Sequence, residues 1–298
     1  MSIRLGTYSI VARDPSSGEL GVAVQSHWFS VGSVVTWAQP GIGAVATQAT
    51  VKISYGPEAL DLLRGGADAS TALSRLLAAD PGAELRQVAV LDGAGRVAAH
   101  TGSECIAHAG HVTGEQVSCQ GNIMVCEAVW PAMLDAYVNA AGPLADRLLS
   151  ALDAGEAAGG DARGRQSAAL LVVPAGGEPW ERLVELRVED HPEPLRELRR
   201  LLVLRDAYRV AEEAQVLAAA GDFARAADRH REAAALAPDS HELLFWGALA
   251  AAQAGDLETA VGQARAAIAM RPAWRELLMV LPPSIAPAAP ALLRALEG

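Results

Sequence analysis

Apolar and polar positions alternate along residues 7–13 and 19–26, and both segments are rich in β-branched residues. A turn-forming Asp-Pro-Ser-Ser-Gly sequence separates them, which predicts a β-hairpin. Similar apolar segments recur along the first two thirds of the chain, and several have apolar residues on both faces. Such strands are typical of sheets that are covered on both sides. The other predicted strands cover residues 33–38, 43–48, 87–91, 97–100, 116–120, 167–173 and 180–188.

Helical periodicity interrupts these strands twice. One predicted helix begins at Tyr55, with Pro57 in its first turn, and others cover residues 67–79, 122–139 and 143–154. The order is therefore strands, two helices, strands, two helices and strands. This order predicts an α+β fold in which two antiparallel sheets lie between outer helices, a four-layer αββα sandwich.

The last third of the chain has helical periodicity only. Two prolines within residues 191–194 suit a linker, so the predicted domains are 1–192 and 193–298. The Ala-Gly-Asp sequence at 220–222 recurs at 254–256, and Pro238 recurs as Pro272, each 34 positions later. That period is typical of tetratricopeptide (TPR) repeats, which predicts an all-α, TPR-like second domain. Residues 207–274 either bind a protein partner or serve as a structural cap or dimer element.

Composition excludes several classes of function. The net charge is −11 and no basic stripe stands out, which argues against nucleic acid as a partner. No apolar run is long enough to predict a membrane-spanning helix, and the start of the chain does not resemble a secretory signal. We therefore expect a cytoplasmic protein. Three cysteines without a metal-binding or paired spacing predict reduced thiols.

The strongest chemical feature is Thr7, which follows Gly6 at the start of the first strand. A threonine at the free end of a chain combines a nucleophilic hydroxyl with an amine that acts as its base. Here the residues before Thr7 must first be removed, for example by self-cleavage of the Gly6–Thr7 bond. A glycine before the threonine leaves the scissile carbonyl accessible.

Other residues are candidates on weaker grounds. Ser26 and His27 end a strand near the same sheet end as Thr7, and a histidine beside a serine can act as its base. Tyr55 is placed to donate to a carbonyl oxygen. Asn122 and Gln166 adjoin backbone N–H groups that suit a carboxylate or amide. The histidines at 108 and 111 lack a third ligand at a defined spacing, so neither a metal nor a cofactor is predicted.

Several motifs occur in the order found in the domain of unknown function family DUF1028, which is grouped with the N-terminal-nucleophile (Ntn) hydrolases. They are TYSIVARDPSSGELGVAVQSHWFSVG (7–32), PGIGAVATQA (40–49), SYGPEALDLL (54–63), AGH (109–111), QGNI (120–123) and GGDARGRQSAALLVV (159–173). The resemblance covers about two thirds of the chain. It implies the αββα sandwich and hydrolysis of an amide bond by an N-terminal Thr, Ser or Cys, and it supplies no substrate.

The sequence also resembles, in part, the proteasome β-type members of that superfamily. By that likeness Thr7 is the nucleophile, Asp161 orients it, and the turn at 47–49, with Gln48, supplies the oxyanion N–H. The chain departs from the pattern in three ways. No lysine lies near residues 34–37, Gln25-Ser26 replaces an aspartate, and Gly164 replaces a serine. Lys52 is a candidate to replace the missing lysine.

Two functions stay open at this point. The first is an amide-bond hydrolase of the Ntn type that acts on a small molecule or peptide, with its repeats for partner binding or homodimerisation. The second is a non-catalytic scaffold whose repeats mediate protein interaction. A third, weaker hypothesis is hydrolysis by an unprocessed chain through Ser26 and His27. The candidate catalytic residues are Thr7, Ser26, His27 and Asp161, and the candidate substrate-binding residues are Gln48, Tyr55, Asn122 and Gln166.

Overall fold

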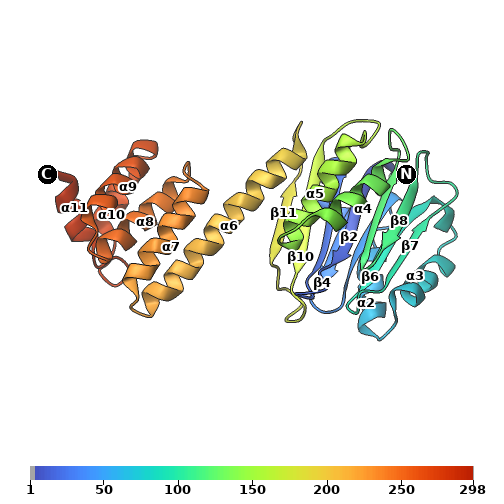
Figure 1. The fold of residues 1–298 in the computed structure, drawn as a ribbon, viewed down its shortest axis with the longest axis horizontal. Coiled ribbons are helices and arrows are strands. Elements are labelled where there is room, and N and C mark those ends of the chain that lie inside the picture. Colours follow the sequence, from blue (N-terminus) through green and yellow to red (C-terminus); the bar gives the residue numbers. More distant parts are fainter. Residues whose placement is uncertain (1–3, 298) are drawn as a thin grey trace. The chain divides into compact units, whose positions relative to one another are not determined.

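The chain divides into two compact units, residues 1–199 and 200–298 (Figure 1). The computed structural model describes residues 4–297. The first unit mixes strands and helices and contains two antiparallel sheets, whereas the second is helical. The division falls within α6 (Pro194–Ala219). The prediction of an α+β fold followed by a helical region is confirmed at this level.

Each sheet is assembled by antiparallel pairing throughout. The first sheet has the order β1 (Arg4–Leu5), β5 (Gly43–Thr50), β6 (Arg86–Asp92) and β7 (Val97–Thr101), and β4 (Thr36–Gln39) also pairs with β5. The second sheet has the order β11 (Val184–Val188), β10 (Ser167–Val173), β3 (Leu20–Ser26), β2 (Thr7–Arg13), β9 (Val117–Asn122) and β8 (Gly110–Gly114).

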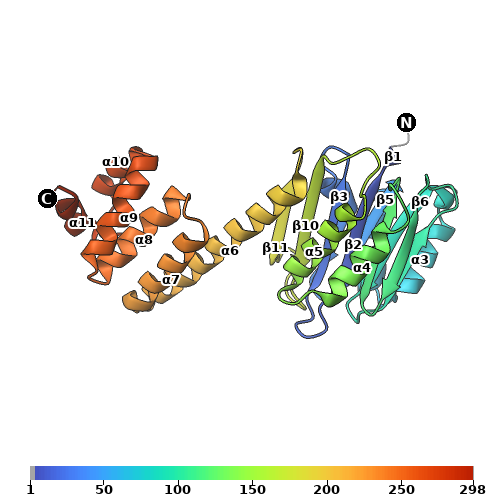
Figure 2. The same cartoon turned by 45° about the horizontal axis from the view of Figure 1, so that its top comes forward.

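A pair of helices packs against each sheet (Figure 2). α2 (Tyr55–Arg64) and α3 (Ala69–Ala78) contact β5 and β6, while α4 (Val129–Asn139) and α5 (Leu144–Ala157) contact β2, β3 and β9. Alternate residues of each strand point to opposite faces. Val22 and Val24 of β3 therefore meet Ala44, Ala46 and Leu91 in an apolar core between the sheets.

Two local predictions are wrong, and one strand is not predicted at all. The sequence predicts a strand over 33–38, but a short helix, α1 (Gly32–Val35), precedes β4. It predicts a helix from Asn122, but this residue pairs with Thr7 at the end of β9, and α4 begins at Val129. Hydrogen bonding of residues 117–122 to β2 overrides the helical pattern at Asn122. Pro131 is tolerated in α4 because it lies in the first turn of that helix. Strand β8 escapes prediction because it is short, polar and flanked by glycines.

In the second unit, helices α7 (Phe223–Leu236) and α9 (Leu257–Met270) begin 34 residues apart. The side chains of Asp222 and Asp256 cap them by accepting bonds from Arg225 N and Thr259 N. The other helices are α8 (His241–Gln253), α10 (Ala273–Val280) and α11 (Ala289–Glu297), and α11 packs on α8 and α9. Among the described residues, no helix is both long and apolar enough to span a membrane.

The core between the sheets gives a direct test of the fold. Leu91 is fully buried there, so Leu91→Ala should lower the free energy of unfolding by about 2–5 kcal/mol through lost burial and a cavity. Val138→Ala on the exposed face of α4 is the control and should change it by less than about 0.5 kcal/mol. Urea denaturation followed by circular dichroism measures both, and equal effects would contradict this core.

Candidate functional site

The peptide bond between Gly6 and Thr7 lies where the chain passes from one sheet to the other. Leu5, at the end of β1, pairs with Ala49 of the first sheet, and Thr7, at the start of β2, belongs to the second. Gly6 and Thr7 are both buried. Antiparallel register then aligns a polar row across the second sheet beside this crossing. The row consists of Asn122, Thr7, Ser26 and Ser167.

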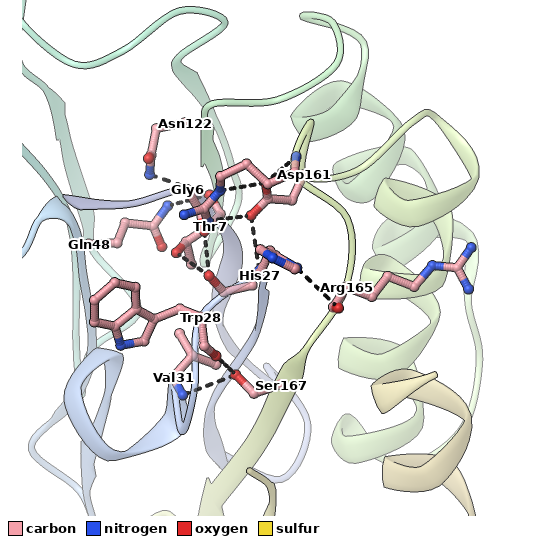
Figure 3. A network of polar contacts seen from close by, with 12 residues as sticks. Gly6, Thr7, His27, Trp28, Val31, Gln48, Asn122, Asp161, Arg165 and Ser167 are labelled. Atoms are coloured by element: carbon pink, nitrogen blue, oxygen red, sulfur yellow. Dashed lines mark hydrogen bonds and ion pairs between the residues drawn. The ribbon is translucent and has the colours of Figure 1, made fainter. Parts of the chain in front are cut away.

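Two hydroxyls of this row, those of Thr7 and Ser26, form a hydrogen-bonded chain that ends at the Gly6 carbonyl. The Ser167 hydroxyl donates instead to the Trp28 carbonyl (Figure 3). The Ser26 hydroxyl donates to the Gly6 oxygen, and Thr7 Oγ1 donates to Ser26 Oγ over 3.1 Å. A serine hydroxyl has one hydrogen, so Ser26 accepts from Thr7 once its own proton points to Gly6. The Arg163 guanidinium donates a second bond to the Gly6 oxygen, from Nη2 at 2.6 Å. Two donors therefore polarise the carbonyl that precedes Thr7.

Asp161 reaches this carbonyl through Arg163. Its carboxylate accepts from Arg163 Nε at 3.0 Å and Nη2 at 2.8 Å, and from the backbone N–H of Arg163 and of His27. The Asp161 side chain is fully buried. Because buried charges need both pairing and hydrogen bonds, the four contacts hold the carboxylate and guanidinium in one geometry. Asp161 thus positions Arg163, and no bond joins it to Thr7.

Buried amides hold the other side of the crossing. Gln48 Nε2 donates to the Thr7 carbonyl at 3.1 Å and to Gln87 Oε1 at 2.7 Å, while Ser9 Oγ donates to Gln48 Oε1. Asn122 Nδ2 also donates to Gln87 Oε1, at 3.0 Å. Gln48 and Asn122, expected to bind substrate, are therefore committed to a network that links the sheets and fixes the Thr7 backbone. Such a network is stable only when its members are satisfied.

Three other candidates lie away from Thr7. The His27 side chain is exposed, and its Nδ1 lies 3.2 Å from the Arg165 carbonyl oxygen. His27 is therefore not the hydrogen-bond partner of the Ser26 hydroxyl, which contacts Thr7 and Gly6. Gln166 binds Asp190 through its side chain, although its backbone N–H donates to the Ser26 carbonyl. Tyr55 belongs to a separate cluster under α3, described below.

The cluster around Asp80 contains both Tyr55 and Lys52. The Tyr55 hydroxyl donates to Asp80 at 2.9 Å, and the Lys52 ammonium lies 3.8 Å from the same carboxylate and 4.9 Å from the centre of the Tyr55 ring. Burial, together with the Asp80 bond, raises the pKa of Tyr55. The bond from Arg86 holds the pKa of Asp80 well below its usual range. Lys52 therefore interacts with Asp80 and Tyr55 and makes no contact with Thr7, so it does not replace the missing lysine beside the nucleophile.

A small cavity of about 170 Å³ adjoins the crossing. Ala49 and Asn122 line it, together with Cys105 and Ile106 from the loop after β7. Ala49 and Ile123, also in the lining, have φ values of 68° and 57°. Non-glycine residues with positive φ carry backbone strain and often lie at functional sites. Among the described residues, no His, Cys, Asp and Glu side chains form a group able to hold a metal ion.

Arg163 and Gln87 are not among the site residues predicted from the sequence. A glutamine at an inward position of the apolar strand β6 was a usable signal, because such a residue needs a buried polar partner. Arg163 had no comparable signal, since only the fold brings it to Gly6.

Residues 7–198 match the model of a family of unknown function, DUF1028. The chain belongs to the DUF1028 family. The crystal structure of protein SPO2555 from Silicibacter pomeroyi is similar, with 35% sequence identity and a TM-score of 0.61. The alignment covers 66% of this chain and 88% of that one. A search of the curated proteins found no match. The residues around Gly6 and Thr7 therefore lie in or next to the DUF1028 region, and the family description assigns them no activity.

The Asp80 cluster predicts a pH dependence of stability in this DUF1028 protein. Because the folded pKa of Asp80 is depressed, its contribution is present above the unfolded value of about 4 and is lost as the pH falls through the folded value. Asp80→Asn should therefore cost about 1–3 kcal/mol at pH 7 and progressively less below pH ~4.

Urea denaturation at pH 7, 4 and 3 measures this difference. Asp61→Asn, at an exposed ion pair on α2, is the matched control and should change stability by less than about 0.5 kcal/mol. A penalty for Asp80→Asn that stays constant across this range would contradict the assignment.

Proposed function

We propose that the first unit is an amide-bond hydrolase of the N-terminal-nucleophile type, in which Thr7 is the nucleophile. Thr7 becomes the first residue when the chain cleaves its own Gly6–Thr7 bond. The observation that carries this proposal is the Gly6 carbonyl, which accepts bonds from both the Ser26 hydroxyl and the Arg163 guanidinium. Two antiparallel sheets with a helix pair on each, the arrangement expected of the αββα sandwich, also support it.

The contacts suggest how self-cleavage proceeds. Thr7 Oγ attacks the Gly6 carbonyl carbon while its proton passes to Ser26, and the Ser26 proton passes to the Gly6 oxygen. Arg163 stabilises the negative charge that develops on this oxygen. The C–N bond then breaks as the proton on the Gly6 oxygen passes to the Thr7 nitrogen, which leaves Gly6 as an ester on Thr7. Water hydrolyses the ester, which releases residues 1–6 with a carboxylate at Gly6.

The same groups serve an external amide after this step. The freed Thr7 amine acts as the base for its own hydroxyl. Ser26 and Arg163 donate hydrogen bonds to the substrate carbonyl oxygen, which takes the place of the Gly6 oxygen. Asp161 keeps Arg163 in position, and the amide network of Gln48 and Asn122 holds the Thr7 backbone. This scheme requires no metal or cofactor.

Intact-mass analysis of the purified chain tests the proposal. The wild type should lose residues 1–6, Thr7→Ser should retain cleavage, and Thr7→Ala should abolish it because no nucleophile remains. Ser26→Ala should slow cleavage about 10²- to 10³-fold, since it removes one donor to the oxyanion.

Ser118→Ala is the matched control for Ser26→Ala. Ser118 is equally buried in β9, but it donates to Gln120 and not to Gly6, so cleavage should continue at nearly the wild-type rate. A wild-type chain that keeps residues 1–6 after prolonged incubation, and hydrolyses no member of a broad amide panel, would refute the proposal.

A second candidate is a scaffold whose helical unit binds a protein partner through residues 207–274. It is favoured by a cavity of about 560 Å³ in the second unit, lined by Phe223, Trp246 and Leu249. His230 also lines the cavity, and its Nδ1 is buried without a partner. A chain that keeps residues 1–6 in the intact-mass experiment would favour this scaffold function over the hydrolase.

A further inference from the structure

The α-carbon of Gly6 faces the Arg163 guanidinium. A Cβ added to Gly6 would lie 2.6 Å from Nη2 and 2.9 Å from both Cζ and Nε of Arg163. Real Cβ atoms essentially never approach a neighbour this closely, so any side chain at this position requires Arg163 to move.

Arg163 is not free to move. Two of its nitrogens bind Asp161, at 3.0 and 2.8 Å, and Nη2 also donates to the Gly6 oxygen. The backbone N–H groups of His27 and Arg163 fix Asp161 in turn. Displacing the guanidinium would break a two-point ion pair and leave the buried Asp161 carboxylate without its charged partner, which is costly.

The segment before the scissile bond lies as an extended strand. Arg4 and Leu5 of β1 pair antiparallel with Thr50 and Ala49 of β5. β4 pairs with β5 further along, opposite residues 43–46, so β1 continues the edge that β4 begins. Loss of residues 1–6 would leave this part of β5 with unpaired backbone groups, which is a site for the addition of an extended peptide.

We propose that the substrates of this site are peptides whose scissile carbonyl belongs to a glycine, bound as an extended strand on residues 49–50 of β5. Arg163, held by Asp161, is the specificity determinant, because it occupies the space of any side chain on the acyl residue. This inference rests on the proposed function and deepens it by naming the substrate class.

Paired fluorogenic peptides test the preference on chains produced with Thr7 as their first residue, so that no variant depends on self-cleavage. Acetyl-Leu-Gly-aminomethylcoumarin should be hydrolysed about 10- to 200-fold faster than acetyl-Leu-Ala-aminomethylcoumarin, the range in which one added methyl group is excluded from a tight site. Arg163→Ala should slow the glycyl peptide and bring the Gly/Ala rate ratio close to one. Arg165→Ala is the matched control and should leave the ratio unchanged, because its guanidinium pairs with Glu156 instead.

The full-length chain gives a second measurement that does not need the Arg163 variant to fold. Gly6→Ala should slow self-cleavage by a similar factor of about 10 to 200. Equal rates for Gly and Ala, in both the peptides and the chain, would overturn the inference and leave the proposed function intact. A chain that neither cleaves itself nor hydrolyses either peptide would overturn both.

Discussion

The carbonyl oxygen of Gly6 lies where the chain leaves one sheet and enters the other, in a place that water does not reach freely. A carbonyl in such a place needs hydrogen-bond donors, and here it receives them from Ser26 and from Arg163. Both donors depend on other parts of the fold. Ser26 is aligned by the antiparallel register of β2 with β3, and Arg163 is held by the buried Asp161. In the proposed function, the same hydrogen bonds also activate this carbonyl toward the Thr7 hydroxyl.

The amide network on the opposite side completes this constraint. Gln48 and Gln87 come from the first sheet, and Asn122 comes from the second, so their bonds join the sheets at the level of Thr7. Apolar residues fill the interface elsewhere. A polar network inside an apolar core favours one register over its alternatives, because a shift would strand several amides without partners. The carbonyls on both sides of Thr7, those of Gly6 and of Thr7 itself, are therefore held by buried or partly buried side chains.

Much of the architecture could be predicted from the sequence, since alternation marks strands such as 7–13 and the repeat spacing marks the caps at Asp222 and Asp256. Thr7 and Ser26 could be singled out because each lies at the end of a strand. The roles of other residues could not be predicted. Gln48 and Asn122 resemble ligand-binding amides in sequence, but their side chains hydrogen-bond within the buried network. Tyr55 and Lys52 interact with Asp80 instead of with Thr7. Arg163 contacts Gly6 across 157 positions, a pairing that no local pattern encodes.

Transfer of the Gly6 acyl group to the Thr7 hydroxyl produces an ester, and trapping this ester with hydroxylamine is the most direct test. The nitrogen of hydroxylamine attacks the ester carbonyl and releases Thr7 with its free amine and hydroxyl. The full-length chain should release residues 1–6 as a peptide with a hydroxamate at Gly6, and Thr7→Ala should release none. Release of the same hydroxamate from Thr7→Ala, or removal of residues 1–6 without any trapped ester, would contradict the account.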